Sequence, residues 1–169
     1  GMLPEFVVGH GAGLSGNDML KRKRMVVAKG VERHKDQMQT VKDMLRCVGG
    51  LDMVGICSGM LACAELKIPF VIDGFITAVA YACAARLDGS IEKQALPSHM
   101  SREPGMAYSL MLGNILAEDV LIRGNMALGE GTGAVIMVSV MKMMVYTMNH
   151  MARLSDFVLS PQEVQAASM

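Results

Sequence analysis

Apolar and polar residues alternate with a helical period through much of the first half of the chain. This pattern predicts a basic amphipathic helix over Asn17–Arg33 and a second helix over about Gln37–Cys47, which ends at Gly49-Gly50. Leu51–Leu66 is apolar and contains several small residues, so we expect a helix that lies close against a sheet.

Ile68–Ile72 is a continuous apolar run, typical of a strand that is buried on both faces of a parallel sheet. It ends at Asp73-Gly74, and Phe75–Leu87 is predicted as the next helix. This order of helix, strand and helix, with short connections, indicates an α/β fold. Ligands of such folds bind beyond the carboxyl ends of the strands. The candidates there are Asp73 and two polar loops expected after the next two strands, around Gln94–Pro97 and Val120–Asn125.

The last long helix is predicted over about Thr132–Arg153. Methionines recur in it at three- and four-residue spacing, which is typical of one face of a packed helix: Met137, Met141, Met144 and Met148. A methionine-rich groove for a partner is the alternative. The tail after Pro161 is expected to fray, which leaves one domain over residues 3–160 and a tail over 161–169.

Composition narrows the class of protein. Apolar residues make up 51% of the 169 residues and charged residues 19%, so much of the chain is expected to be buried in a core or against a partner. The 16 basic residues balance the 16 acidic ones, which gives no general attraction to nucleic acid or to an anionic membrane. Each long apolar stretch contains a charge and no signal pattern is visible, so we expect a cytoplasmic protein. The spacing of cysteines and histidines favours neither a metal site nor a cofactor.

Two loops contain residues suited to a phosphate group. Gly9–Gly13 precedes the helix that carries Lys23, so its backbone N–H groups and this lysine could hold a phosphate, although a plain turn explains the loop equally well. In His99–Gly105, Ser101 is interpreted either as a helix N-cap, with Glu103 in the first helical turn, or as a phosphate ligand.

Leu128–Gly133 reads Leu-Gly-Glu-Gly-Thr-Gly and places a carboxylate between glycines where a helix begins. Each glycine weakens a helix by about 1 kcal/mol relative to alanine, so this spacing indicates a sharp bend or the close approach of a flat ligand. Glu130 is interpreted either as a helix cap or as a general base that abstracts a proton. Its apolar neighbours favour the protonated carboxyl and the helix N-terminus favours the carboxylate, and the sequence leaves both effects open.

Four short segments carry a specific resemblance because they occur in one order and at suitable spacing: Val8–Leu14, Ile68–Ile76, Ser98–Gly105 and Leu128–Ala134. Together they resemble the C-terminal half of the nicotinate-nucleotide–dimethylbenzimidazole phosphoribosyltransferase (CobT) family. The resemblance implies a Rossmann-like parallel sheet flanked by helices. It also implies transfer of phosphoribose from nicotinate mononucleotide to a benzimidazole-type base, which yields α-ribazole phosphate and nicotinate in the synthesis of the cobalamin lower ligand.

The resemblance also implies roles for individual residues. In family members a glutamate of the matching Gly-Glu-Gly loop takes the proton from the attacking base nitrogen, a role that falls on Glu130. The matching leucine of the base pocket is Leu128, and the groups that serve the phosphate and ribose are Ser101 and Lys23, with Arg22 as the alternative to the lysine. Further substrate-binding residues are expected within the same motifs: Gly11, Gly13, Asp73, Gly105, Gly129 and Gly131.

One family feature has no counterpart in this sequence. A Glu-Met-Gly-Ile-Gly-Asn-Thr-like motif belongs to the N-terminal half of the family, so a partial domain is expected here. Family members are homodimers, and a chain this apolar is expected to form a homodimer or to pair with its missing half. The alternative to an enzyme is a catalytically incomplete nucleotide-binding or assembly module that needs that half. A homologue with another acceptor, such as a purine or a phenolic compound, is a third interpretation.

Overall fold

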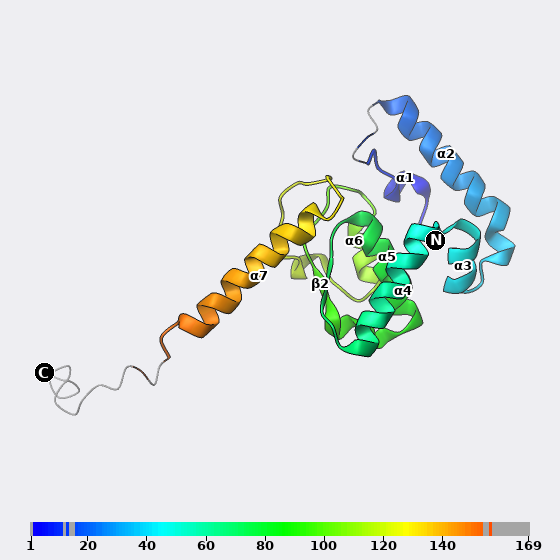
Figure 1. Cartoon of the computed structure of the whole chain (residues 1–169). Helices are drawn as coiled ribbons and strands as arrows, with labels where there is room; N and C mark the ends of the chain where they lie inside the picture. The colour runs from blue at the N-terminus through cyan, green and yellow to red at the C-terminus, as the bar shows by residue number, and fades with distance from the viewer. Residues whose placement is uncertain (1, 12, 14–15, 154–155, 157–169) are drawn as a thin grey trace, which may run out of the picture. The chain divides into compact units, whose positions relative to one another are not determined.

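The computed structural model describes residues 2–11, 13, 16–153 and 156. The chain divides into two compact units, Gly1–Met137 and Val138–Met169, and the boundary falls within the last helix. The elements follow one another as α1 Pro4–Val7, α2 Asn17–His34, η1 Lys35–Gln37, α3 Val41–Val48, α4 Leu51–Leu66, β1 Phe70–Ile72, α5 Phe75–Leu87, η2 Gly89–Gln94, β2 Ala95–Pro97, α6 Met106–Leu112, η3 Ala117–Asp119 and α7 Thr132–His150 (Figure 1).

The sheet in the described residues consists of two parallel strands, β1 and β2. Phe70 pairs with Ala95 and Ile72 with Pro97, and an isolated parallel bridge joins His99 to Ile122. The interpretation of Gln94–Pro97 as a loop after a strand is wrong, because these residues contain β2 itself. Pro97 suits this position since it ends the strand, where its missing N–H disturbs the ladder least.

Helix α3 begins at Val41, four residues later than predicted. Thr40 ends the preceding turn with a capping box, in which its Oγ1 accepts from the Asp43 N–H at 3.2 Å and Asp43 Oδ2 accepts from the Thr40 N–H at 3.0 Å. The Thr40 hydroxyl also donates to Asp43 Oδ2 at 2.7 Å, and this bond, together with that of the Thr40 N–H, holds the pKa of Asp43 below its usual value. Lys35–Gln37 forms a separate 3-10 turn instead.

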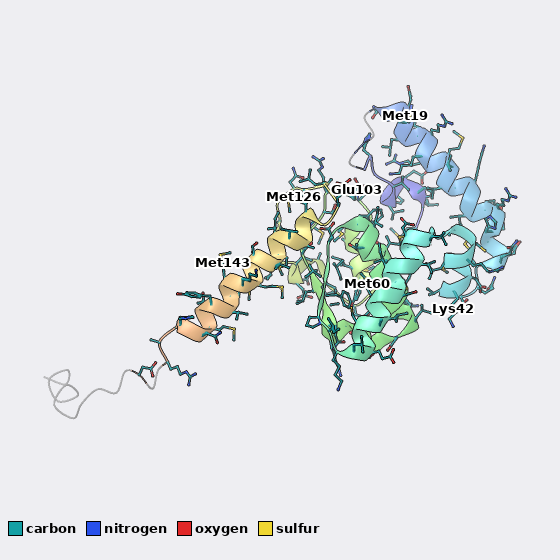
Figure 2. All side chains as sticks on the ribbon, in the orientation of Figure 1. Met19, Lys42, Met60, Glu103, Met126 and Met143 are labelled. Carbon is teal, nitrogen blue, oxygen red and sulfur yellow. The ribbon has the colours of Figure 1, made fainter. Side chains whose placement is uncertain are left out.

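The core of the first unit is built around α5. Alanines and Tyr81 of this helix are fully buried, and α5 packs against α4 and α6. Met60, labelled in Figure 2, extends from α4 into this core. The Tyr81 hydroxyl donates to the Gly113 carbonyl at 2.9 Å, and burial raises the pKa of Tyr81 to about 12. Because Ile72 is also fully buried, the end of β1 is firmly held beneath the site described below.

The methionines of α7 do not form one buried face. Met137, in the first unit, is buried, whereas Met144 is 51% and Met148 76% exposed. The interpretation of this stripe as one face of a packed helix is therefore wrong in the second unit. There the helix is the sole regular element among the described residues, so no other element of that unit packs against it. The helix ends at His150, three residues before the predicted end.

Within the described ranges, no helix combines the length and the apolar character needed to span a bilayer.

Candidate active site

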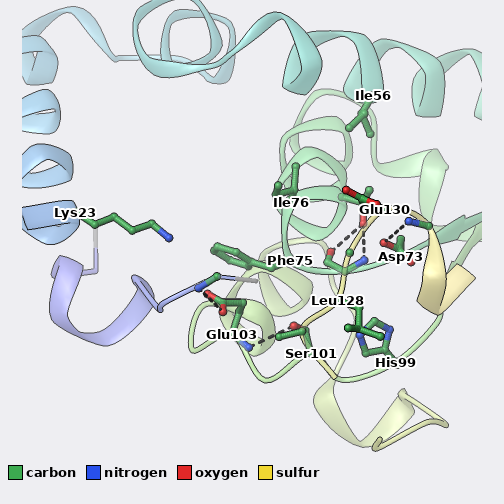
Figure 3. Close-up of a pocket in the computed structure, with 16 residues that line it drawn as sticks. Lys23, Ile56, Asp73, Phe75, Ile76, His99, Ser101, Glu103, Leu128 and Glu130 are labelled. Atoms are coloured by element: carbon green, nitrogen blue, oxygen red, sulfur yellow. Dashed lines mark hydrogen bonds between the residues drawn. The ribbon is translucent and has the colours of Figure 1, made fainter. Parts of the chain in front are cut away.

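A cavity of about 520 Å³ opens at the carboxyl end of β1 in the first unit (Figure 3). Its walls come from the residues that follow β1, the loop that follows β2, and the loop that precedes α7, and Gly11 and Lys23 contribute from the N-terminal segment. This is the edge of a parallel sheet at which α/β proteins bind ligands. The cavity therefore lies at the edge of the sheet where the sequence predicts the site.

Asp73 joins two walls of this cavity. It follows β1 directly, is 8% exposed, and accepts hydrogen bonds from two backbone amides of the segment that begins α7. The Gly131 N–H lies 3.1 Å from Oδ2 and the Ala134 N–H lies 2.9 Å from Oδ1. The carboxylate therefore satisfies amides at a helix N-terminus, where negative charge is favoured.

The loop before α7 turns sharply at three consecutive residues. Gly129, Glu130 and Gly131 have φ values of +77°, +56° and +82°, and the turn is closed by a 3.1 Å hydrogen bond from the Thr132 N–H to the Gly129 carbonyl. Glycines meet this demand without strain, whereas a glutamate at positive φ is disfavoured by about 1 kcal/mol. The glutamate side chain is exposed and lines the cavity. The predicted sharp bend is thus present, and the strained residue is Glu130, the candidate base from the sequence.

Two long side chains hold Gly9 and Gly11 of the predicted glycine-rich loop, of which residue 12 lies outside the described residues. Lys23 Nζ donates to the Gly9 carbonyl at 3.0 Å, and the Gly11 N–H donates to Glu103 Oε1 at 2.9 Å. Arg22 is exposed and does not line the cavity, so Lys23 is the cation that faces it.

Ser101 and Glu103 do not cap a helix. Helix α6 begins only at Met106, with Gly105 as its N-cap, so the capping interpretation of Ser101 is wrong. Instead the Ser101 hydroxyl accepts from the Glu103 N–H at 3.3 Å and donates to the Met126 carbonyl at 3.4 Å, while the Glu103 carboxylate reaches the distant Gly11. Both side chains thereby face the cavity rather than a helix end.

Most of the predicted site residues meet in this one cavity. Those that line it are Gly11, Lys23, Asp73, Ser101, Leu128, Gly129, Glu130 and Gly131. Gly105 does not, because it packs beneath the Phe75 ring, which a side chain at this position would overlap. Gly13 also lies outside the lining, and a Cβ added there would have no neighbour within 4 Å.

Further lining residues escaped the sequence interpretation. Three of them form an apolar wall: Ile56 of α4, and Phe75 and Ile76 at the start of α5. Phe75 and Ile76 directly follow Asp73-Gly74, but an apolar pair at this position is equally typical of residues buried in the core. Ile56 lies within an apolar helix and gave no separate signal. His99 also lines the cavity and is only 3% exposed. In the sequence, a single histidine beside a serine forms no recognisable catalytic or metal-binding pattern. No group of three His, Cys, Asp or Glu side chains among the described residues is arranged to hold a metal ion.

The fold and the cavity together define an α/β protein with a site that joins a cation, several carboxylates and an apolar wall. The family model for a phosphoribosyltransferase matches residues 1–157. The chain belongs to this phosphoribosyltransferase family, and the predicted resemblance is confirmed.

Individual relatives agree with this assignment. The nicotinate-nucleotide–dimethylbenzimidazole phosphoribosyltransferase of Clostridium tetani is 35% identical over 150 residues, which are 89% of this chain and 40% of the relative. The enzyme of that name from Acetivibrio thermocellus is 32% identical, over 95% of this chain and 45% of its own. The crystal structure of CobT from Thermus thermophilus superposes with a TM-score of 0.80 at 31% identity, over 95% of this chain and 46% of that one, which confirms the α/β fold. The chain thus spans less than half the length of these relatives.

Proposed function

We propose that this chain provides the catalytic cavity for transfer of phosphoribose from nicotinate mononucleotide to a benzimidazole-type base. The observation that carries the proposal is the meeting of Glu130, Lys23 and Ser101 in one cavity of a chain that is similar to enzymes of that name. The transfer would yield α-ribazole phosphate and nicotinate, as the family resemblance implies.

The proposed roles follow from the chemistry of the walls. Lys23 and Ser101 bind the phosphate, and the apolar wall of Ile56, Phe75 and Leu128 receives the flat base. The bond from C1′ to the nicotinate nitrogen breaks, and its electron pair stays on that nitrogen. A nitrogen of the base forms the new bond to C1′, and the Glu130 carboxylate takes the N–H proton of the base.

The surrounding carboxylates support this chemistry. Positive charge develops on the ribose as the bond to nicotinate breaks, and preorganised negative groups stabilise such charge. Asp73, Glu103 and Glu130 all line the cavity, against the single lysine that faces it within the described residues.

The test mixes the full chain with nicotinate mononucleotide and dimethylbenzimidazole and measures nicotinate release. Glu130→Gln is expected to lower the rate by about 10²–10⁴-fold, the usual contribution of a general base, with binding of the mononucleotide retained. Glu65→Gln, an exposed change on α4, is the matched control. Undiminished turnover by Glu130→Gln would overturn the general-base role.

A nucleotide-binding module is the second candidate, because Lys23 and Ser101 line one cavity and could hold the mononucleotide without any transfer step. Calorimetric binding of the mononucleotide without nicotinate release would select it over the enzyme. As part of the same proposal, we infer a cytoplasmic protein that forms a homodimer or pairs with a polypeptide that supplies the rest of the family's fold. The exposure of Leu128, at 63%, and of Ile76, at 58%, beside the cavity supports such a partner.

A further inference from the structure

His99 is held in the cavity wall by contacts on two sides. It follows β2 closely, its backbone bridges to Ile122, and its ring lies beside Gly74 and Gly133. A Cβ added at Gly133 would overlap the Nδ1–Cε1 edge of the ring. That edge is therefore packed against the first turn of α7.

The hydrogen bonds of Ser98 determine which ring nitrogen carries the proton. The buried Ser98 hydroxyl donates its single proton to the Asp73 carbonyl, which is an acceptor only. His99 Nδ1 lies 3.0 Å from the same hydroxyl oxygen, so Nδ1 must be the donor in this contact. In the neutral imidazole, Nε2 then holds the lone pair and acts as an acceptor.

Nε2 is left available to a ligand. No hydrogen bond of the described residues engages it, and it is absent from the fully buried atoms that lack a partner. Both oxygens of the neighbouring Asp73 carboxylate already accept a hydrogen bond from a backbone amide. A side chain that is 97% buried, as its 3% exposure implies, thus presents one unpartnered acceptor beside a cavity.

The chemistry of the proposed substrate identifies the matching donor. The phosphate and carboxylate of nicotinate mononucleotide are acceptors at neutral pH, and its pyridinium nitrogen carries no proton. The ribose hydroxyls are its hydrogen-bond donors. In Figure 3, Ser101 lies between Lys23 on one side and His99 on the other, which is the order expected for a phosphate followed by a sugar.

We propose that His99 Nε2 accepts a hydrogen bond from a ribose hydroxyl of the bound nucleotide. This inference rests on the proposed function and adds a sugar-binding residue to it. His99 would distinguish a ribonucleotide from a nucleotide that lacks the matching hydroxyl. Ser98 would act as a positioning residue, because it fixes the tautomer of His99 without contact to the sugar.

The test combines two measurements on the full chain. Nitrogen-15 NMR of the histidine rings reads the tautomer directly, and we expect the proton of His99 on Nδ1. Binding by calorimetry compares nicotinate mononucleotide with its 2′-deoxy and 3′-deoxy forms. His99→Asn keeps an amide nitrogen near the position of Nδ1 and removes Nε2, and His150→Asn, in the second unit, is the control.

We expect His99→Asn to weaken binding of the mononucleotide by about threefold to tenfold, the effect of one neutral hydrogen bond, and to leave the affinity for one deoxy form unchanged. An equal loss for all three ligands, no loss for any, a proton on Nε2, or no binding by the unsubstituted chain would each overturn the inference. Selective loss without nicotinate release would support His99 and count against transfer. Nicotinate release without a selective loss of affinity would support transfer and count against the role of His99.

Discussion

The Asp73 carboxylate accepts a hydrogen bond from the backbone N–H of Gly131, with 3.1 Å between Oδ2 and the nitrogen. The two residues are 58 positions apart in the sequence, and Glu130 lies directly before the donor. Because Asp73 follows a fully buried residue of β1, the loop that carries Glu130 is fixed to the core rather than to its own helix alone. The position of the proposed base thus depends on a residue that takes no proton itself.

Asp73→Asn tests this dependence. The amide keeps one acceptor oxygen but turns an NH₂ group toward a backbone N–H, so one hydrogen bond and the favourable charge at the helix N-terminus are lost. We expect the free energy of unfolding to fall by about 1–3 kcal/mol, measured by urea denaturation. Nicotinate release should fall further than mononucleotide affinity, because the loop with Glu130 is no longer held.

Asp52→Asn is the control for this change. Asp52 also lies in the first turn of a helix, but it is exposed, so its loss should cost under about 1 kcal/mol. An effect of Asp73→Asn no larger than that of Asp52→Asn would contradict the anchoring role.

Helices α4 and α5 occupy the ranges that the sequence predicts. Their boundaries are local, because Gly50 precedes one and Gly74 precedes the other. β2 was not predictable in the same way. Its three residues, Ala95–Pro97, carry little strand pattern, and they become a strand by pairing with β1. A strand that forms only by pairing with residues 25 positions earlier in the chain has no strand pattern in its own residues.

The candidate site shows the same distinction. Glu130 stands in a recognisable loop and Lys23 in the basic helix that follows another, so residue chemistry and motif resemblance together predicted them. The contact of Glu103 with Gly11 spans 92 positions, and local rules assigned Glu103 to a helical turn that does not exist. Gly105 shows the reverse case. Its motif predicted a substrate-binding residue, whereas in the structure its lack of a side chain makes room for the Phe75 ring.

Gly133→Ala tests the close approach of α7 to His99. The new methyl group would overlap the imidazole edge and lie 3.0 Å from Ser98 Oγ, so helix or ring must move. We expect a loss of about 1–3 kcal/mol in the free energy of unfolding and a change in the ring NMR signals of His99. Gly59→Ala in α4 meets no atom within 4 Å and should raise stability by up to about 1 kcal/mol. Equal effects of the two substitutions would rule out the steric explanation.

Lys23→Met and Arg22→Met separate two neighbouring cations. Lys23 faces the cavity, whereas Arg22 is exposed and outside it. Replacement of Lys23 removes a charge-assisted contact with the phosphate, so mononucleotide affinity should fall by about tenfold to a hundredfold in calorimetry. Arg22→Met should change affinity by less than about threefold at roughly 0.15 M salt, since screening weakens a distant charge. The reverse order of effects would assign the phosphate to Arg22.

The buried hydroxyl of Tyr81 predicts a loss of stability in alkali. Burial, and secondarily the Glu92 carboxylate, raise its pKa from 10.0 to about 12. Between these values the unfolded chain releases the proton and the folded chain keeps it, so the free energy of unfolding falls as pH rises, by up to about 1.4 kcal/mol per unit. Below pH 10 the contribution is fully present.

Tyr81→Phe isolates this effect from the other groups that titrate in alkali. The variant leaves the Gly113 carbonyl without its donor, so it should be less stable at pH 7 by about 1–2 kcal/mol. Its stability should then fall less steeply than that of the unsubstituted chain as pH passes from 10 to 12. Parallel curves for Tyr81→Phe and the unsubstituted chain would mean that Tyr81 titrates alike in both states, because only a group with different folded and unfolded pKa values makes stability depend on pH.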